Sequence, residues 1–107
     1  MIVLFVTEFV HSFQRIRAAD QKAARAFVRQ ARQELQNVPD PSGFQSLPFR
    51  VAMEVNTKLF MFLRKTVSLD PSDVVFSLTD GRFVILFLVN TQNLGTAEIW
   101  CVKRLTP

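Results

Sequence analysis

Histidine and cysteine, the side chains that most often act as nucleophiles, general bases or metal ligands, each occur once in this chain. They are His11 and Cys101, far apart in the sequence. A cysteine–histidine nucleophilic pair needs the two side chains in contact and a carboxylate that orients the histidine. We therefore expect His11 to be a surface or capping residue and Cys101 to be a small buried apolar residue.

The acidic residues are scattered, and Asp70 and Asp73 form the one suggestive pair. Because Pro71 and Ser72 lie between them, a capped turn explains this pair better than general acid–base chemistry. The chain has no glycine-rich phosphate loop, and its single cysteine excludes an internal disulfide and a cysteine-based zinc site. The sequence therefore predicts no catalytic residues, no cofactor and no metal site.

Four basic residues follow one another at helical spacing, at steps of three, four and three: Lys22, Arg25, Arg29 and Arg32. They share one face of the predicted helix, opposite its apolar stripe. This basic face is either a solvated surface, a site for an acidic protein partner, or a site for nucleic acid or lipid head groups. No aromatic residue interleaves with these basic residues on this face of the helix, which argues against base stacking there and makes nucleic acid an unlikely partner.

Length and composition fit a single small domain. The chain has 107 residues, a net charge of +4 and a pI near 10.0, with 49% apolar residues. The basic balance favours acidic partners. The longest uninterrupted apolar run is Phe83 to Val89, far short of the roughly 20 residues that cross a bilayer. The first residues do not fit a signal peptide, so we expect a cytoplasmic protein whose membrane association, if any, is peripheral.

The elements that must position these residues follow from the apolar pattern. Residues 1–6 are either a short strand or an apolar lead-in, and residues 7–38 are predicted to form one long amphipathic helix that ends at Pro39 to Gly43. The apolar stripe of this helix consists of Phe9, Phe13, Ile16, Ala23, Phe27, Ala31 and Leu35.

The second half of the chain is predicted to be mainly sheet. Leu47 to Val55 alternate as a half-buried strand, and residues 57–67 fit a second helix, although a strand is the alternative there. Residues 74–78 and 83–89 form two strands, with the Asp80-Gly81 pair as a hairpin turn between them. We expect an α+β domain with its α/β core at 47–95, and residues 96–107 as a last strand or a tail.

One segment, Leu59 to Asp80, resembles the autophagy ubiquitin-like modifiers of the GABA-receptor-associated-protein and microtubule-associated light-chain type. The pattern consists of aromatic and aliphatic residues, then Arg64-Lys65, Leu69 and Phe76. The basic segment from His11 to Arg25 is similar to the N-terminal helix of that family, and Leu94-Gly95 is similar to its C-terminal end. The family has a first strand after its basic helix, which has no counterpart here, and the segment between Phe76 and Gly95 is too short for the family's last helix. The residues after Gly95, among them Ile99 to Val102, are also more apolar than a disposable tail would be.

The resemblance implies a ubiquitin-like (β-grasp) fold and a modifier without catalytic activity. It implies that Gly95 is joined to a lysine or to a lipid at a membrane surface, after removal of residues 96–107. It also implies that acidic-hydrophobic peptide motifs of partner proteins dock between a strand and the central helix. The positions that match the family's peptide site are Phe49, Arg50, Val51, Phe60, Leu63 and Arg64.

Two other functional interpretations remain open from the sequence. The excess of phenylalanine and the apolar last strand are also typical of a small assembly domain that forms homo-oligomers through a sheet edge or through its long helix. The basic face of the long helix is compatible with a nucleic-acid-binding adaptor, whose affinity would fall steeply with salt.

Overall fold

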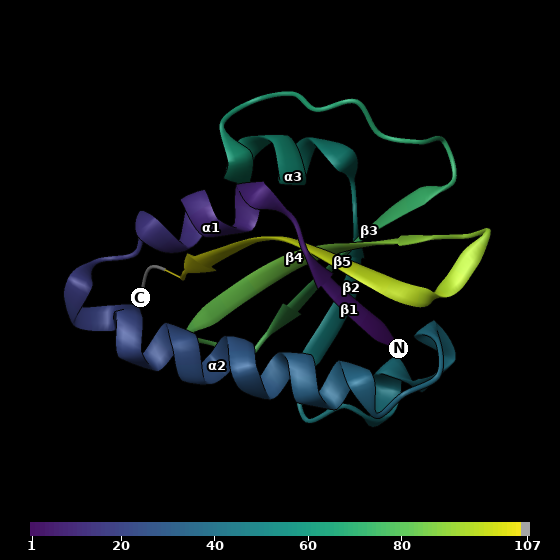
Figure 1. Ribbon diagram of the computed structural model, residues 1–107, viewed down its shortest axis with the longest axis horizontal. Coiled ribbons are helices and arrows are strands. Elements are labelled where there is room, and N and C mark those ends of the chain that lie inside the picture. The colour runs from purple at the N-terminus through teal and green to yellow at the C-terminus, as the bar shows by residue number, and fades with distance from the viewer. Residues whose placement is uncertain (106–107) are drawn as a thin grey trace.

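The computed structural model describes residues 1–105, which form one five-stranded sheet with helices on both of its faces (Figure 1). The strand order is β1-β5-β4-β3-β2, in which β1 runs parallel to β5 and all other neighbours are antiparallel. The strands are β1 (Ile2–Phe5), β2 (Arg50–Glu54), β3 (Asp73–Thr79), β4 (Phe83–Asn90) and β5 (Asn93–Arg104).

The helices divide the molecule into layers. They are α1 (Thr7–Gln14), α2 (Ala18–Gln36), the 3-10 helix η1 (Pro41–Ser46) and α3 (Asn56–Leu63). The long helix α2 and η1 cover one face of the sheet, and α3 covers part of the other face (Figure 1). Strand β1 pairs with β5 only from Thr96 to Ile99, and helix α1 lies beside the part of β5 beyond that point.

Strand β4 lies at the centre of the sheet and separates two apolar cores. Phe83, Ile85 and Phe87 face the core under α2, whereas Val84 and Leu86 face the core under α3. Because both faces of this strand are covered, it reads as an unbroken apolar run rather than as an alternating one. Its hairpin to β3 turns at Gly81, which has a φ of 95° and confirms the predicted Asp80-Gly81 turn.

Phenylalanine rings fill the core under α2. The Phe44 ring of η1 lies edge-on to Phe76 and Phe87, with ring centroids 5.2 and 5.6 Å apart. The Phe27 ring of α2 lies 5.9 Å from Phe83 of β4. These contacts fix η1 and α2 on the sheet, and they account for much of the phenylalanine excess without an oligomer.

The predicted helix 7–38 is wrong as one element, because the structure divides it into α1 and α2. The chain changes direction at Arg15–Arg17, where Ile16 is buried in the core. No proline or glycine marks this point, and the apolar spacing continues through it. Tertiary packing causes the break, since α1 follows the edge of β5 while α2 crosses the face of the sheet.

Strand β2 is shorter than predicted and forms an edge of the sheet. It pairs only with β3 within the described chain, and η1 precedes it. The predicted inward positions Met53 and Val55 are 71% and 67% exposed, so their burial was predicted wrongly. The second predicted helix is confirmed as α3, but it ends at Leu63 and not at residue 67.

Residues 96–104 belong to β5, which lies between β1 and β4. Ala97, Ile99 and Cys101 are buried in this strand, and Gly95 lies within it. Cleavage after Gly95 would remove most of a central strand. The interpretation of these residues as a disposable tail is therefore wrong, while Thr106 and Pro107 lie outside the described residues.

Among residues 1–105, no helix is both long and apolar enough to cross a membrane.

Candidate functional site

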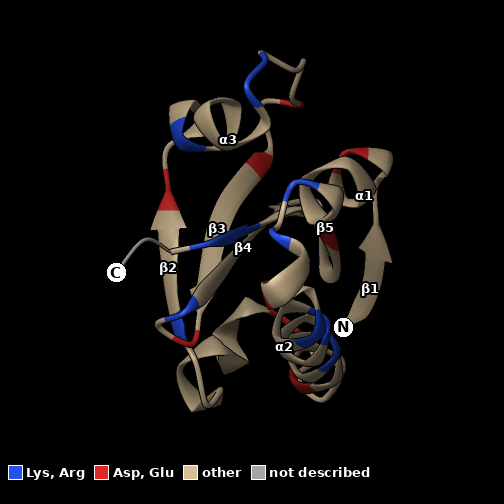
Figure 2. Ribbon diagram, turned by 90° about the vertical axis from the view of Figure 1, so that its left-hand side faces the viewer, with Lys and Arg blue, Asp and Glu red and all other residues tan. Residues whose placement is uncertain are grey.

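A cleft of about 190 Å³ opens where three parts of the chain meet. These are the connection between α1 and α2, the end of α3, and the end of β5; all three carry basic residues (Figure 2). The residues that line it are Ser12, Arg15, Ile16, Arg17, Asp20, Phe62, Arg64, Val102, Lys103 and Arg104. We call this site the basic cleft.

The basic cleft exists because α1 replaces β1 along the edge of β5. The Val6 N–H donates to the Ile99 carbonyl oxygen at 3.2 Å, and there the chain leaves the sheet and enters α1. Within α1, the Ser12 hydroxyl accepts a hydrogen bond from the buried Val102 N–H at 3.0 Å and donates to the Phe9 carbonyl at 2.8 Å. This contact holds the end of α1, and therefore Arg15, against the end of β5.

Cations outnumber acids in the cleft by five to one, because Asp20 is the only carboxylate in its lining. The two ion pairs formed within residues 1–105 are Lys58–Glu54 and Lys65–Glu8, and neither includes a cleft residue. The positive charges therefore have little internal compensation, and a recessed surface with one sign of charge attracts an anion of opposite sign.

Aromatic contacts position two of these cations. The Lys103 ammonium lies 4.8 Å from the centre of the Phe62 ring, a cation–π distance. The Arg104 guanidinium lies over the Phe83 ring at 5.4 Å, and its Nη1 donates to the Arg82 and Leu105 carbonyls, each at 2.9 Å. Arg104 is thus held in place, whereas Lys103 keeps its ammonium at the surface.

The N-terminus of α2 adds to the positive field. Its N-cap residue is Arg17, which makes no side-chain capping bond, so the first N–H groups of the helix lack a side-chain acceptor. Such groups, together with the helix dipole, favour an anion at this end. Asp20 in the first turn offsets part of the field.

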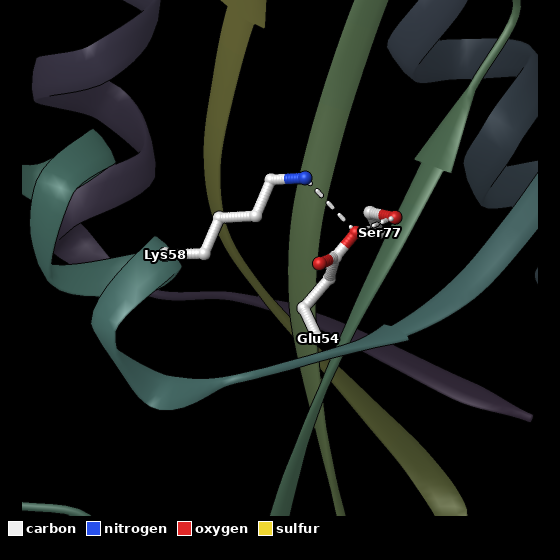
Figure 3. Close-up of polar contacts among 3 residues, drawn as sticks. All are labelled: Glu54, Lys58 and Ser77. Carbon is white, nitrogen blue, oxygen red and sulfur yellow. Dashed lines mark hydrogen bonds and ion pairs between the residues drawn. The ribbon is translucent and has the colours of Figure 1, made fainter.

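A polar contact fixes the start of α3 relative to the sheet. The Glu54 Oε1 accepts hydrogen bonds from Lys58 Nζ at 3.0 Å and from the Ser77 hydroxyl at 2.9 Å (Figure 3). Burial raises the pKa of Glu54, but these two hydrogen bonds and the Lys58 charge outweigh burial, so the net pKa is lowered. By joining β2, β3 and α3, this contact sets the position from which α3 carries Phe62 and Arg64 to the cleft.

The residues singled out for chemistry occupy structural positions. His11 is exposed on α1, and Cys101 is buried, which raises the pKa of its thiol to about 12. The Asp73 carboxylate accepts from the Asp70 N–H at 3.0 Å and from the Asn90 side chain at 3.0 Å, which confirms a capped turn. No group of three potential metal ligands occurs within residues 1–105.

The four residues of the basic face are exposed on α2, as predicted. They are not part of the cleft lining, and Arg25 lies over the Phe13 ring at 5.5 Å. Their ligand stays a prediction that nothing in the structure tests.

The six residues of the expected peptide site do not form one surface. Leu63 is buried, and Phe49 lies edge-on to Phe27 in the core under α2 at 5.8 Å. Arg50 is exposed at the start of β2, while Val51 and Phe60 are half-buried. Only Arg64 belongs to the basic cleft.

Sequence reasoning missed the basic cleft. Arg15 and Arg17 are separated from Lys103 and Arg104 by most of the chain, and their spacing follows no motif. The only signal was the excess of basic residues, which does not indicate where they gather.

The chain matches no family model and no curated protein. Among solved structures it is similar to a chain of the archaeal RelE–RelB complex from Pyrococcus horikoshii OT3, with a TM-score of 0.50 and 16% sequence identity. The match covers 96% of this chain and 92% of that chain. At this identity it shows a shared fold.

This finding overturns the resemblance to autophagy ubiquitin-like modifiers. The α+β class is correct, but the β-grasp fold, the modifier function, conjugation through Gly95 and peptide docking of that type are wrong. The resembling segment spans α3 and β3, yet α3 has only eight residues, and the longest helix, α2, covers the opposite face. An amphipathic helix followed by a strand is common to many folds, so that pattern did not identify this one.

Proposed function

We propose that this protein binds a single-stranded nucleic acid by its phosphate groups in the basic cleft. The observation that carries the proposal is the convergence of five cations on one recessed site with a single carboxylate among them. This is more positive charge than one phosphate group neutralises, so a ligand with successive phosphates suits it best.

The size and composition of the cleft favour a single strand over a duplex. A cleft of about 190 Å³ is large enough for one nucleotide unit of a single strand. A duplex is too wide to enter it and would contact only the residues around its opening. Phe62 lies in the cleft lining beside Lys103, so the cleft combines its cations with an aromatic ring, as the α2 face does where Arg25 lies over Phe13. The proposal concerns the cleft and not the α2 face.

Fluorescence anisotropy with labelled single-stranded RNA and DNA oligonucleotides tests the proposal. The double variant Arg15→Gln/Lys103→Gln removes two cleft charges, and Arg29→Gln/Arg32→Gln removes two charges from the exposed face of α2 as a matched control. We expect the cleft variant to bind at least about ten-fold more weakly, with a salt slope lower by about 1.4, and the control to bind nearly as the wild type does.

Equal losses in the two double variants would show that binding reflects net charge rather than the cleft. Absence of binding by the wild-type protein at low salt would refute the proposal. Circular dichroism of each variant establishes that the fold is retained.

We propose in addition that the protein works in a complex with a partner protein. The support is that the structural neighbour was solved as a RelE–RelB complex, and that β1, an edge strand, exposes apolar side chains. Ile2 and Leu4 on this edge strand are 64% and 48% exposed.

The complex is tested by light scattering on the protein isolated from its native cells. We expect a fixed stoichiometry with one partner that Leu4→Lys abolishes and Met53→Lys, at an exposed position of β2, preserves. A monomeric wild-type protein, or equal effects of the two variants, would contradict this part of the proposal.

A further inference from the structure

Arg64 has an unusual backbone conformation for its residue type. It follows the last residue of α3 and has a φ of 61° and a ψ of 30°, the left-handed region. Within residues 1–105 it is the only residue other than glycine with a positive φ. An L-amino acid with a side chain pays a steric penalty in this region that glycine does not.

The helix cap itself does not require arginine. The Lys65 N–H donates to the Phe60 carbonyl at 3.1 Å, and the Arg64 N–H donates to the Met61 carbonyl at 3.3 Å. This pair of bonds is the Schellman arrangement, in which the left-handed position is usually glycine. Both bonds involve only the backbone, so glycine would form the same cap with less strain.

The position of the Arg64 side chain at the basic cleft accounts for an arginine at this residue rather than a glycine. It lines the basic cleft on the α3 side, across from the residues that the α1–α2 connection contributes. Its neighbour Lys65 instead approaches Glu8 of α1, with Nζ and Oε2 3.9 Å apart. The sharp turn at the cap thus separates two adjacent cations, and only Arg64 lies at the cleft.

We propose that Arg64 is a ligand-contacting residue that binds a phosphodiester group from the α3 side of the cleft, and that its left-handed conformation is retained for binding at the expense of fold stability. This inference rests on the proposed function. A guanidinium suits the role because it binds two phosphate oxygens at once through parallel hydrogen bonds.

The variant Arg64→Gly separates binding from stability, because the two quantities should change in opposite directions. We expect its melting temperature to rise by about 4 °C and its affinity for the single-stranded oligonucleotide to fall about ten-fold. Arg64→Lys should leave the melting temperature unchanged and give an intermediate affinity. Arg29→Ala, on the exposed face of α2, should leave both nearly unchanged.

Wild-type affinity in Arg64→Gly, in a protein whose wild type binds the oligonucleotide, would overturn this inference and leave the proposed function intact. A lower melting temperature in Arg64→Gly would overturn its conformational part. If the wild type does not bind at all, both the inference and the proposed function are wrong.

Discussion

Ser12 is the residue whose removal tests most directly how the cleft is built. Its hydroxyl is the acceptor for the Val102 N–H, which lies on the part of β5 that has no strand on its α1 side. Ser12 and Val102 are only 5% and 2% exposed. The variant Ser12→Ala would therefore leave a buried backbone donor without its protein partner.

The expected cost follows from that burial. An unsatisfied buried donor costs about 1–3 kcal/mol, and the hydrogen bond to the Phe9 carbonyl is lost as well. For a chain of this length we expect the melting temperature to fall by about 4 °C or more. Because Ser12 also holds the end of α1, the affinity of the cleft for an oligonucleotide should fall in parallel.

Thermal and urea denaturation measure the loss, and Ser46→Ala is the matched control. The Ser46 hydroxyl donates to the Gly43 carbonyl at 2.7 Å in an exposed position. We expect this control to change the free energy of unfolding by less than about 0.5 kcal/mol. Amide hydrogen exchange at Val102 should accelerate in Ser12→Ala alone.

Equal destabilisation by Ser12→Ala and Ser46→Ala, with unchanged exchange at Val102, would refute this reasoning. The attachment of α1 to β5 would then depend on apolar packing, and the serine would be incidental.

Three other outcomes follow from an aromatic side chain of the core, a partly exposed carboxylate and a buried thiol. Replacing Phe44 by alanine should lower the free energy of unfolding by about 3–5 kcal/mol in urea denaturation, since its ring contacts two phenylalanines of the sheet. Glu54→Gln should cost about 1–2 kcal/mol at neutral pH. Because the pKa of Glu54 is lowered in the fold, this advantage of the wild type should be complete above the ordinary carboxyl pKa and be lost as the pH falls below it, through the lowered pKa of the folded protein. Burial raises the pKa of Cys101 from 9.0 to about 12, so the thiol loses its proton at a lower pH in the unfolded chain than in the folded protein. The stability of the wild type relative to Cys101→Ala should therefore decline between pH 9 and 12. A thiol reagent at about pH 8 should label the residue only when the protein unfolds.

Local patterns predicted several elements well because their causes are local. The β3–β4 hairpin depends on Gly81 and on apolar runs that any covered central strand requires, and both are visible in the sequence. The capped turn at Asp70 and Asp73 likewise depends on side chains close to one another in the chain.

Other features depend on contacts between distant segments and could not be predicted in this way. The break between α1 and α2 has no local marker, because Ile16 continues the apolar spacing of both helices. The exposure of Met53 results from the edge position of β2, which only the strand order determines. The basic cleft brings Arg17 and Lys103 together for the same reason.

The family resemblance failed because it relied on pattern without topology. The segment after Leu59 is an amphipathic helix and a strand in this fold too, so the match in residue types was real. Gly95 was interpreted as the C-terminal residue of a mature modifier, whereas it lies in β5, the strand between β1 and β4 in the sheet.

The most direct test of the central claim is an NMR titration of the protein with a single-stranded RNA oligonucleotide. The account predicts that the largest amide shifts occur at Arg15 to Asp20, Arg64 and Lys103 to Arg104, and that they shrink with added salt. Shifts centred on the exposed face of α2 or on β2, with these cleft amides unchanged, would contradict it.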